Sequence, residues 1–351
     1  MREIAPSFFR ASNRKILLLI NSAPKTHNRC YSSVPTLPLR DEGKPKRDAF
    51  LRKYGLHDLN LVWPQTVNSS QTEVDYVKKN PKSISQMYGE SDLSKLPIFQ
   101  GGFINFGYWP NPFFNDSKIS IEQRIECSKE LYRVIGNLAG ILKHYSSILE
   151  VGCGLGYGTA LLSQQFQPKL AIGLDISPDQ VARAKKCHVS GIKSGKLRFT
   201  IGEAESLPFA DHSFDSVISV EAAQHFISMS SFSEEVSRIL KPGGKLVMTS
   251  FFPANKEGVE ALNAIIPDYH VHGSQHTIDE IQGKLATNME GVKVKSIGEN
   301  VWDGFAKWLD QIGYQHQWTK IWGALYEKGL IDYVIYEAEA PKESLQLKSG
   351  F

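Results

Sequence analysis

Several features that would assign a protein to a class at once are missing from this 351-residue sequence. It has no run of about 18 apolar residues, which argues against a membrane-spanning helix, and no internal repeat. Its four cysteines, Cys30, Cys127, Cys153 and Cys187, match no zinc or disulfide spacing, so they fit a reducing compartment and mostly a role as small core residues. With 41% hydrophobic and 22% charged residues, the chain is expected to be globular and is long enough for one large domain or for a core domain with an appended cap.

Acidic residues are scarce at the start of the chain. Residues 1–33 hold six basic residues but only one acid, Glu3, together with many hydroxyl side chains. This composition is typical of an organelle transit peptide, and Arg29 lies three residues before Ser32, as in the mitochondrial processing pattern. We therefore expect a transit peptide over residues 1–33 and a protein of the mitochondrial matrix. A basic tail on a cytoplasmic protein is the alternative.

Removal of residues 1–33 takes away six positive charges and one negative charge, which moves the formal net charge from +3 to −2. The basic character of the sequence thus belongs mostly to the leader. A mature chain close to neutrality offers no electrostatic argument for a nucleic-acid partner.

Helical and strand patterns alternate along the rest of the chain, which predicts an α/β fold with a doubly wound, mostly parallel sheet. Residues 34–117 read as a partly helical approach segment and cofactor lid, 118–340 as the main domain with a substrate cap at about 251–300, and 341–351 as a tail. The predicted strands are 147–152, 169–177, 197–204, 213–223, 244–252 and 330–342. The predicted helices include 118–145, 158–166, 177–191 and 230–244.

The first of these strands runs directly into the glycine-rich turn LEVGCGLGYGT, residues 149–159. A dinucleotide-binding turn has the pattern G-x-G-x-x-G; Gly152 and Gly154 fit its first two positions, but Tyr157 occupies the third. A P-loop is excluded because no Gly-Lys-Ser/Thr follows. The third glycine is instead Gly156, and an acid, Glu150, stands two residues before the first.

The pattern Glu-x-Gly-x-Gly-x-Gly resembles the cofactor turn of class I S-adenosylmethionine-dependent methyltransferases. Glycines lack a Cβ and let the backbone approach the methionine end of that cofactor, while Glu150 would orient this cationic end or the turn itself. Further motifs extend the resemblance over roughly residues 100–255, including Asn105 to Trp109, which is similar to an aromatic lid of small-molecule members. The resemblance implies a Rossmann-like fold with a seven-stranded sheet, S-adenosylmethionine as cofactor, and methyl transfer.

The resemblance also implies which residues bind the cofactor. Asp175, at the end of the next strand, would accept the ribose hydroxyls, because Ser177 is available to cap the following helix instead. Glu203 stands where the family has aspartate in its adenine-binding turn, one methylene longer. The full expected set is Tyr108, Glu150, Gly152, Cys153, Gly154, Gly156, Asp175, Ile176, Gln180, Glu203, Ala204 and Glu221. Tyr108 could instead pack in the core, and Gln180 could be a solvated helix residue.

His225 is the candidate catalytic residue. It follows the fourth strand, at the sheet edge where open α/β sheets bind ligands. Methyl transfer mainly requires that the nucleophile be positioned and water excluded, but a hydroxyl or protonated amine must also lose a proton, and histidine titrates in a suitable range. His225 is therefore a candidate general base; a residue that only lines the pocket is the alternative.

The C-terminal third is expected to select the substrate. Four tryptophans between residues 302 and 322 suggest an apolar, aromatic or prenyl-like acceptor, although helical spacing also fits core packing. His270, His272 and His276 lie close together, but the expected interpretation is a loop that lines the pocket or is exposed, so no metal site is predicted.

We therefore expect methylation of a small organic acceptor, most readily on oxygen, with carbon or nitrogen as alternatives and the oligomeric state open. EAAQ follows the fourth strand in place of an amine-binding tetrapeptide such as Asn-Pro-Pro-Tyr, which argues against nucleobase or glutamine substrates. A protein methyltransferase acting on a mitochondrial partner and a non-catalytic assembly factor are the rival interpretations.

Overall fold

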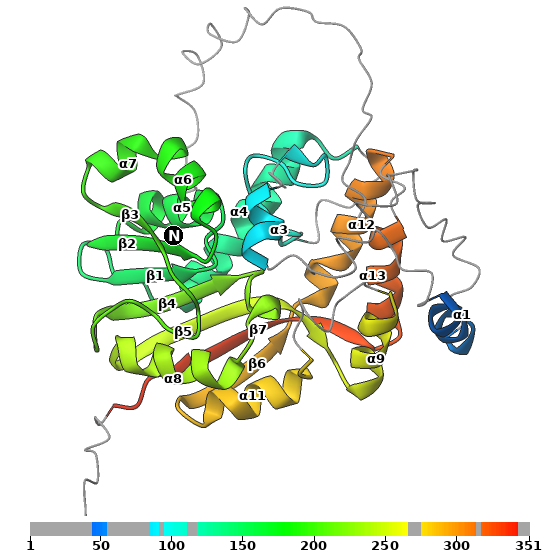
Figure 1. Ribbon diagram of the computed structural model, residues 1–351. Helices are drawn as coiled ribbons and strands as arrows, with labels where there is room; N and C mark the ends of the chain where they lie inside the picture. The colour runs from blue at the N-terminus through cyan, green and yellow to red at the C-terminus, as the bar shows by residue number, and fades with distance from the viewer. Residues whose placement is uncertain are drawn as a thin grey trace, which may run out of the picture. The chain divides into compact units, whose positions relative to one another are not determined.

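Seven strands form one sheet in the computed structural model of the chain, in the order β3-β2-β1-β4-β5-β7-β6 (Figure 1). The structure describes residues 44–54, 84–90, 95–110, 118–265, 275–313 and 317–342, which belong to one compact unit. The strands are β1 (Ser147–Val151), β2 (Leu170–Asp175), β3 (Leu197–Ile201), β4 (Phe214–Val220), β5 (Leu240–Pro253), β6 (Glu290–Ser296) and β7 (Ile331–Glu339). The first five run parallel, and β7 lies antiparallel to both β5 and β6. The predicted doubly wound, mostly parallel sheet is thus confirmed.

The helices follow the strands along the chain as an α/β fold requires. They are α1 (Lys44–Lys53), α3 (Ile84–Glu90), α4 (Ile121–Leu138), α5 (Tyr157–Phe166), α6 (Pro178–Cys187), α7 (Val189–Lys193), α8 (Met229–Ile239), α9 (Lys256–Ile265), α11 (Ile278–Ala286), α12 (Trp302–Gln311) and α13 (Gln317–Glu327), with 3-10 turns η5 (Ala223–His225) and η6 (Gly298–Asn300). Ser177 caps α6 through its side chain and Pro178 opens its first turn, as the sequence predicted.

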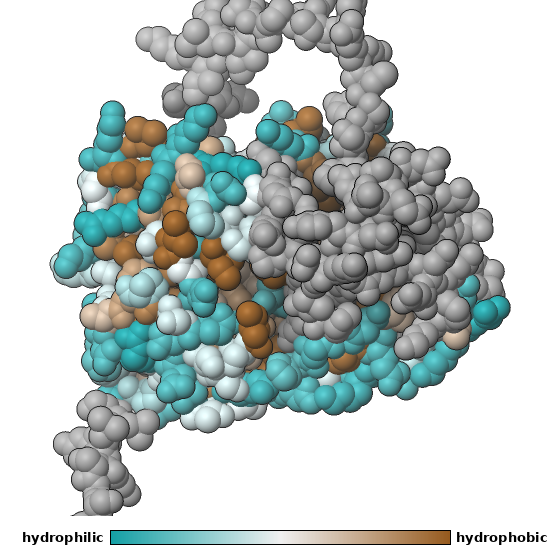
Figure 2. Space-filling model, viewed as in Figure 1, coloured by the Kyte–Doolittle hydropathy of each residue, from teal (hydrophilic) through white to brown (hydrophobic). Residues whose placement is uncertain are grey.

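Successive residues of a strand point to opposite sides of the sheet. Helices cover both sides, so both faces of the sheet are buried. In β4, Ile218 shares a core with Leu131 of α4 and Leu162 of α5, whereas its neighbour Val217 shares the other core with Phe232 of α8. The outer faces of α8 and α11, along the lower edge of the view, are largely hydrophilic (Figure 2). These helices therefore present one apolar face to the sheet and one polar face outward.

The segment 251–300, predicted to be a substrate cap, differs from that expectation. It contains α9, α11 and β6. β6 pairs with β7 as the edge strand of the sheet, and Ile281 and Leu285 of α11 belong to the same core as Phe232. β6 was not predicted because it exposes most of its residues, and its apolar alternation is limited to Val292 and Val294 between lysines.

Some predictions fall outside the described residues: the transit peptide at 1–33, His270, His272 and the end of the tail. None of the helices in the described ranges is both long enough and apolar enough to cross a membrane.

Candidate active site

A cavity of about 640 Å³ opens at the carboxyl ends of β1, β2 and β4. The chain leaves β1 toward β2 and β3 and then crosses back to β4, so this is the topological switch point, where α/β sheets bind ligands. Residues that line the cavity include Ile84, Tyr88, Phe103, Ile104, Gly152, Cys153, Gly154, Asp175, Ile176, Gln180, Glu203, Ala204, Glu205, Glu221, His225, Phe226 and Ile227. Of the thirteen residues predicted for the site, ten line this one cavity; Tyr108, Glu150 and Gly156 do not.

The glycine turn is held by main-chain bonds to the end of β2. The N–H groups of Gly152 and Cys153 donate to the Leu174 carbonyl at 2.8 and 2.9 Å. Gly152 and Gly156 have φ of +79° and +72°. A Cβ would lie 2.2 Å from the Ala222 side chain at Gly152, and 2.3 Å from the Phe199 ring at Gly156. The first and third glycines are therefore required by the close approach of β1 to the β4 end and of α5 to β3.

Asp175 fixes the middle of the turn. Its Oδ2 accepts from the Gly154 N–H at 2.8 Å and its Oδ1 from the Ser177 N–H at 2.9 Å. Burial raises the pKa of this carboxyl, and the two N–H donors partly oppose that shift. Because Asp175 also lines the cavity, its remaining lone pairs are available to a ligand; the ribose role stays a prediction.

Glu150 lies behind the turn instead of facing the cavity. The hydroxyl groups of Tyr132 and Thr159 donate to its two oxygens, the first at 2.8 Å. Burial raises its pKa to about 7, against the opposing effect of these two bonds. Glu150 was predicted to orient either the cationic end of the cofactor or the turn itself. Its contacts are of the second kind, because Glu150 joins β1 to α4 and α5, the helices that carry Tyr132 and Thr159.

Gln180 presents an unsatisfied donor on the cavity wall. The side chain is buried, its Oε1 accepts from Arg183 Nη1 at 3.4 Å, and its Nε2 has no hydrogen-bond partner among the described residues. A Cβ built on Gly154 would lie 4.0 Å from this Nε2. A buried amide without a partner is costly, so this position favours a ligand with an acceptor group beside Gly154.

Glu221 lines the cavity at the end of β4, beside Ala222, which packs close to Gly152. Glu221 has φ of +50°, an uncommon conformation for a residue other than glycine that clusters at functional sites. Its Oε1 accepts from the Phe106 N–H at 2.6 Å and from the Tyr333 hydroxyl at 2.7 Å. Burial raises its pKa to about 7, while these two bonds and the charge of Arg124 act to lower it.

His225 faces a tyrosine that the sequence did not single out. The Tyr88 hydroxyl and His225 Nε2 share a hydrogen bond of 3.0 Å, and their rings meet edge to face at 5.6 Å. Burial raises the pKa of Tyr88, which keeps its hydroxyl protonated. No pattern in the sequence joins Tyr88 to His225, which lie 137 positions apart.

Tyr88 is brought to the cavity by α3, which docks on the first two turns of α6. Arg183 donates to the carbonyls of Tyr88 and Gly89 at 3.3 and 2.7 Å, and Ser85 donates to the Ile176 carbonyl at 3.3 Å. Gly89 lies so close to α6 that a Cβ would be 2.8 Å from Asp179 Oδ2. Helix α3, which belongs to the predicted approach segment 34–117, therefore covers one side of the cavity.

The aromatic segment 105–109 was predicted to cover the cofactor through Tyr108. The structure places Phe103 and Ile104 at the cavity instead, and the Tyr108 N–H donates to the Cys127 carbonyl at 2.9 Å. The fully buried Arg124 holds this segment by donating to the Asn105 carbonyl at 2.6 Å. The residues that line the cavity, Phe103 and Ile104, thus lie five and four positions before Tyr108, just ahead of the predicted segment.

Three tryptophans of the C-terminal third pack in the protein core. Trp302, Trp308 and Trp322 are buried in apolar clusters and none of them lines the cavity. Trp302 and Trp322 stack on each other at 6.0 Å. Their number therefore does not support an aromatic acceptor, and the apolar residues that line the cavity include Ile84, Phe103, Ile104, Phe226 and Ile227.

The residues present fit the cofactor implied by the glycine turn. The wall around Gly154 is open to close approach, Asp175 offers acceptors, and Gln180 Nε2 offers a donor without a partner among the described residues. Glu203 and Ala204 form the neighbouring wall after β3. These donors and acceptors match the hydroxyl, carboxylate and ammonium groups of a nucleoside joined to an amino acid.

Comparison with known proteins agrees with this site. Residues 149–248 match the family model of a methyltransferase domain. The chain is 28% identical over 184 residues to O-methyltransferase cnsE of Penicillium expansum, covering 52% of this chain and 63% of that protein. It is 32% identical over 152 residues to the fatty-acid O-methyltransferase of Mycolicibacterium smegmatis, covering 43% and 53% of the two chains.

Among solved structures, the geranyl diphosphate C-methyltransferase from Streptomyces coelicolor A3(2), in complex with Mg²⁺, geranyl diphosphate and S-adenosyl-L-homocysteine, has a TM-score of 0.59 at 15% identity. The match covers 73% of this chain and 96% of that chain, and at this identity it concerns the fold alone. Residues 149–248 therefore form a methyltransferase domain, as the glycine turn predicted. It spans 53–63% of the length of the two curated relatives.

Proposed function

We propose that this chain binds S-adenosylmethionine and transfers its methyl group to a small, largely apolar organic acceptor, most readily at a hydroxyl oxygen. The observation that carries the proposal is that one cavity is lined both by the glycine turn with Asp175 and by the paired His225 and Tyr88. The first set suits the cofactor and the second suits an acceptor that must lose a proton.

The residues of the glycine turn would hold the cofactor. Asp175 would accept hydrogen bonds from the ribose, Gln180 Nε2 would donate to an acceptor group, and Glu203 with Ala204 would flank the base. Glu221, a carboxylate that lines the cavity at the end of β4, would lie toward the cationic methionine end. When bound, S-adenosylmethionine supplies a methyl carbon that is already activated by its positive sulfur, so the protein needs to position the acceptor and exclude water.

At the acceptor end, His225 would take the proton from the acceptor hydroxyl, directly or through Tyr88, as the new carbon–oxygen bond forms. Tyr88 bonds to His225 Nε2 and so fixes the ring relative to α3. Ile84, Phe103 and Phe226 would exclude water around the reacting atoms. A carbon or an already neutral nitrogen acceptor would depend much less on His225.

Methyl tracing tests this function. The full-length protein is incubated with methyl-labelled S-adenosylmethionine and, in parallel, with mitochondrial and cytosolic extracts, and the products are separated into organic, aqueous and protein fractions. Label in an organic or aqueous product, lost with Asp175→Ala, is the expected result. Label in protein would favour the protein methyltransferase, and tight cofactor binding without any labelled product would favour the non-catalytic interpretation.

We further propose the mitochondrial matrix as the compartment, supported by the Arg-rich, acid-poor residues 1–33. Imaging of the full chain fused at its C-terminus to a fluorescent protein tests this, and amino-terminal sequencing of the imported form locates the cut relative to Ser32. A diffuse cytosolic signal would refute it.

A further inference from the structure

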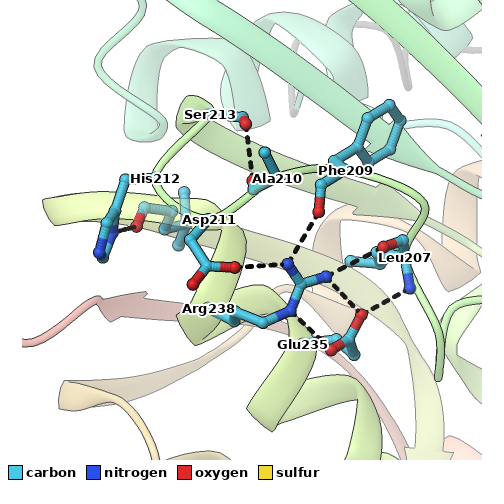
Figure 3. Close-up of polar contacts among 9 residues, drawn as sticks. Leu207, Phe209, Ala210, Asp211, His212, Ser213, Glu235 and Arg238 are labelled. Carbon is cyan, nitrogen blue, oxygen red and sulfur yellow. Dashed lines mark hydrogen bonds and ion pairs between the residues drawn. The ribbon is translucent and has the colours of Figure 1, made fainter.

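The second half of the loop between β3 and β4, residues 202–213, is bonded to Arg238 and Glu235 of α8 (Figure 3). Arg238 Nε and Nη2 donate to the two oxygens of Glu235, each at 2.8 Å. Its Nη1 donates to the Phe209 carbonyl and to Asp211 Oδ1, both at 2.8 Å, and its Nη2 to the Leu207 carbonyl at 3.0 Å. Planar guanidinium–carboxylate pairs of this kind fix geometry as well as charge. The last turn of α8 therefore fixes the second half of the loop.

The first half of the loop is tied to the other end of the same helix by Glu205. Its Oε1 accepts from the N–H groups of Ile227 and Ser228 at 2.7 and 3.2 Å. Ser228 is the N-cap residue of α8, and its hydroxyl accepts from the Ser231 N–H at 3.2 Å. A carboxylate at a helix N-terminus is also favoured by the helix dipole. The β3–β4 loop is thus attached at both ends of α8.

This tie joins the two ends of the cavity. Glu205 follows Glu203 and Ala204 by one to two positions, on the wall assigned to the cofactor, whereas Ile227 follows His225 by two positions. The N–H groups of His225 and Phe226 bond within their own turn, to Ala222 and Ala223. The N–H group of Ile227 is therefore the first one after His225, among the described residues, that bonds to a residue outside this loop. It donates to Glu205.

We propose that Glu205 is a positioning residue that couples the cofactor wall to the loop carrying His225. This rests on the proposed function, because it assumes that the cofactor occupies the wall beside Glu203. A ligand that orders residues 203–205 would then also order residues 225–228, since one carboxylate belongs to the first segment and holds the second. Coupling of this kind is reciprocal, so an ordered acceptor end would in turn favour cofactor binding.

Amide hydrogen exchange of the full-length protein, with and without S-adenosylhomocysteine, tests the coupling without knowledge of the acceptor. In the unchanged protein, the ligand should slow exchange in residues 152–176 and also in residues 221–228. In Glu205→Ala, residues 221–228 should exchange about tenfold faster without ligand, because two hydrogen bonds to a charged group are lost. The ligand should still protect residues 152–176 but no longer residues 221–228.

Three further variants separate the effect of the length of the Glu205 side chain from the effect of its charge. Glu205→Gln keeps an oxygen at the same distance and should restore most of the protection. Glu205→Asp keeps the charge but is one methylene shorter, so it should behave like Glu205→Ala. Glu234→Ala, which removes a carboxylate from an exposed position on α8, is the matched control and should behave like the unchanged protein.

The outcomes are distinct. Equal ligand protection of residues 221–228 in Glu205→Ala and in the unchanged protein would overturn the coupling while leaving the proposed function intact. Ligand protection of neither segment in the unchanged protein would overturn the proposed function and the coupling with it. Loss of protection in Glu205→Gln to the same degree as in Glu205→Ala would show that charge alone acts, which contradicts a positioning role through the two N–H groups.

Discussion

The two ends of the cavity are built in different ways. The end assigned to the cofactor comes from consecutive strand ends, where main-chain N–H groups of the turn bond to Leu174 and Asp175. The end assigned to the acceptor combines Tyr88, Phe103 and His225, which come from distant parts of the sequence. A site made of backbone and glycines depends on local sequence, whereas a site made of side chains on separate segments depends on how those segments dock.

The largest expected effect is at the acceptor end. Replacement of the candidate base in His225→Ala should lower turnover by about 10²–10⁴-fold, the usual contribution of general acid–base catalysis. Affinity for S-adenosylhomocysteine should change by less than about twofold, because that ligand would occupy the other end. Turnover is followed with the labelled product of the tracing experiment and affinity by calorimetry. His144→Asn, at an exposed left-handed position remote from the cavity, is the control; unchanged turnover in His225→Ala would rule out the base.

The converse variant, Asp175→Ala, should impair the cofactor end. Two hydrogen bonds from Gly154 and Ser177 to a buried carboxylate are lost together with the acceptors that face the cavity. We expect S-adenosylhomocysteine to bind about 100-fold more weakly, since bonds to charged groups contribute roughly 1.5–3 kcal/mol each. Asp175→Asn, which keeps one acceptor oxygen, should lie in between. If calorimetry shows the same affinity for all three proteins, Asp175 has no part in binding.

A backbone-built end should also be intolerant of one added methyl group. Gly156→Ala would place a Cβ 2.3 Å from the Phe199 ring at φ of +72°, so we expect a loss of about 2 kcal/mol in the free energy of unfolding. Gly283→Ala in α11, where a Cβ would meet nothing within 4 Å, should instead be neutral or stabilising by up to about 1 kcal/mol. Urea titration compares them, and equal stabilities would refute the role given to Gly156.

The same contrast explains which parts of the molecule the sequence could predict. Buried five- to seven-residue runs and the Ser-Pro start of α6 identify the parallel strands and their helices, and the spacing of Glu150 and Gly152 identifies the turn. Tyr88 could not be found in this way, because it reaches His225 only once Arg183 holds α3 against α6. The sequence motif indicated Tyr108, whereas Phe103 lines the cavity, because a motif shows that a segment is near a site but not which side chain faces it.

Core packing explains why the tryptophans of the C-terminal third do not report on the acceptor. Trp302, Trp308 and Trp322 fill apolar clusters away from the cavity. Their abundance reflects the packing of the core and gives no information about an aromatic acceptor. Glu150 was predicted to orient either the cationic end of the cofactor or the turn itself, and the bonds from Tyr132 and Thr159 to both of its oxygens fit the second role. Neither hydroxyl lies at a spacing that a sequence pattern would associate with a buried acid.

The smallest expected effect concerns this buried Glu150, where burial raises the pKa to about 7 from an ordinary 4.5. The folded protein therefore holds this proton more tightly than the unfolded chain. The resulting stability is fully present below about pH 4.5 and is lost as the pH rises through 7. In Glu150→Gln, which can still bond to both hydroxyls, this loss is absent.

The free energy of unfolding of the unchanged protein should accordingly fall, relative to Glu150→Gln, by roughly 2 kcal/mol between pH 5 and pH 8. Glu221 shares the raised pKa but is present in both proteins, so its contribution cancels in the difference. Urea titrations at the two pH values give that difference, with Glu234→Gln on the exposed side of α8 as the control. A difference that is independent of pH would mean that Glu150 is ionised throughout and that the turn rests on a buried carboxylate, which would make the cofactor end depend on charge as much as on backbone.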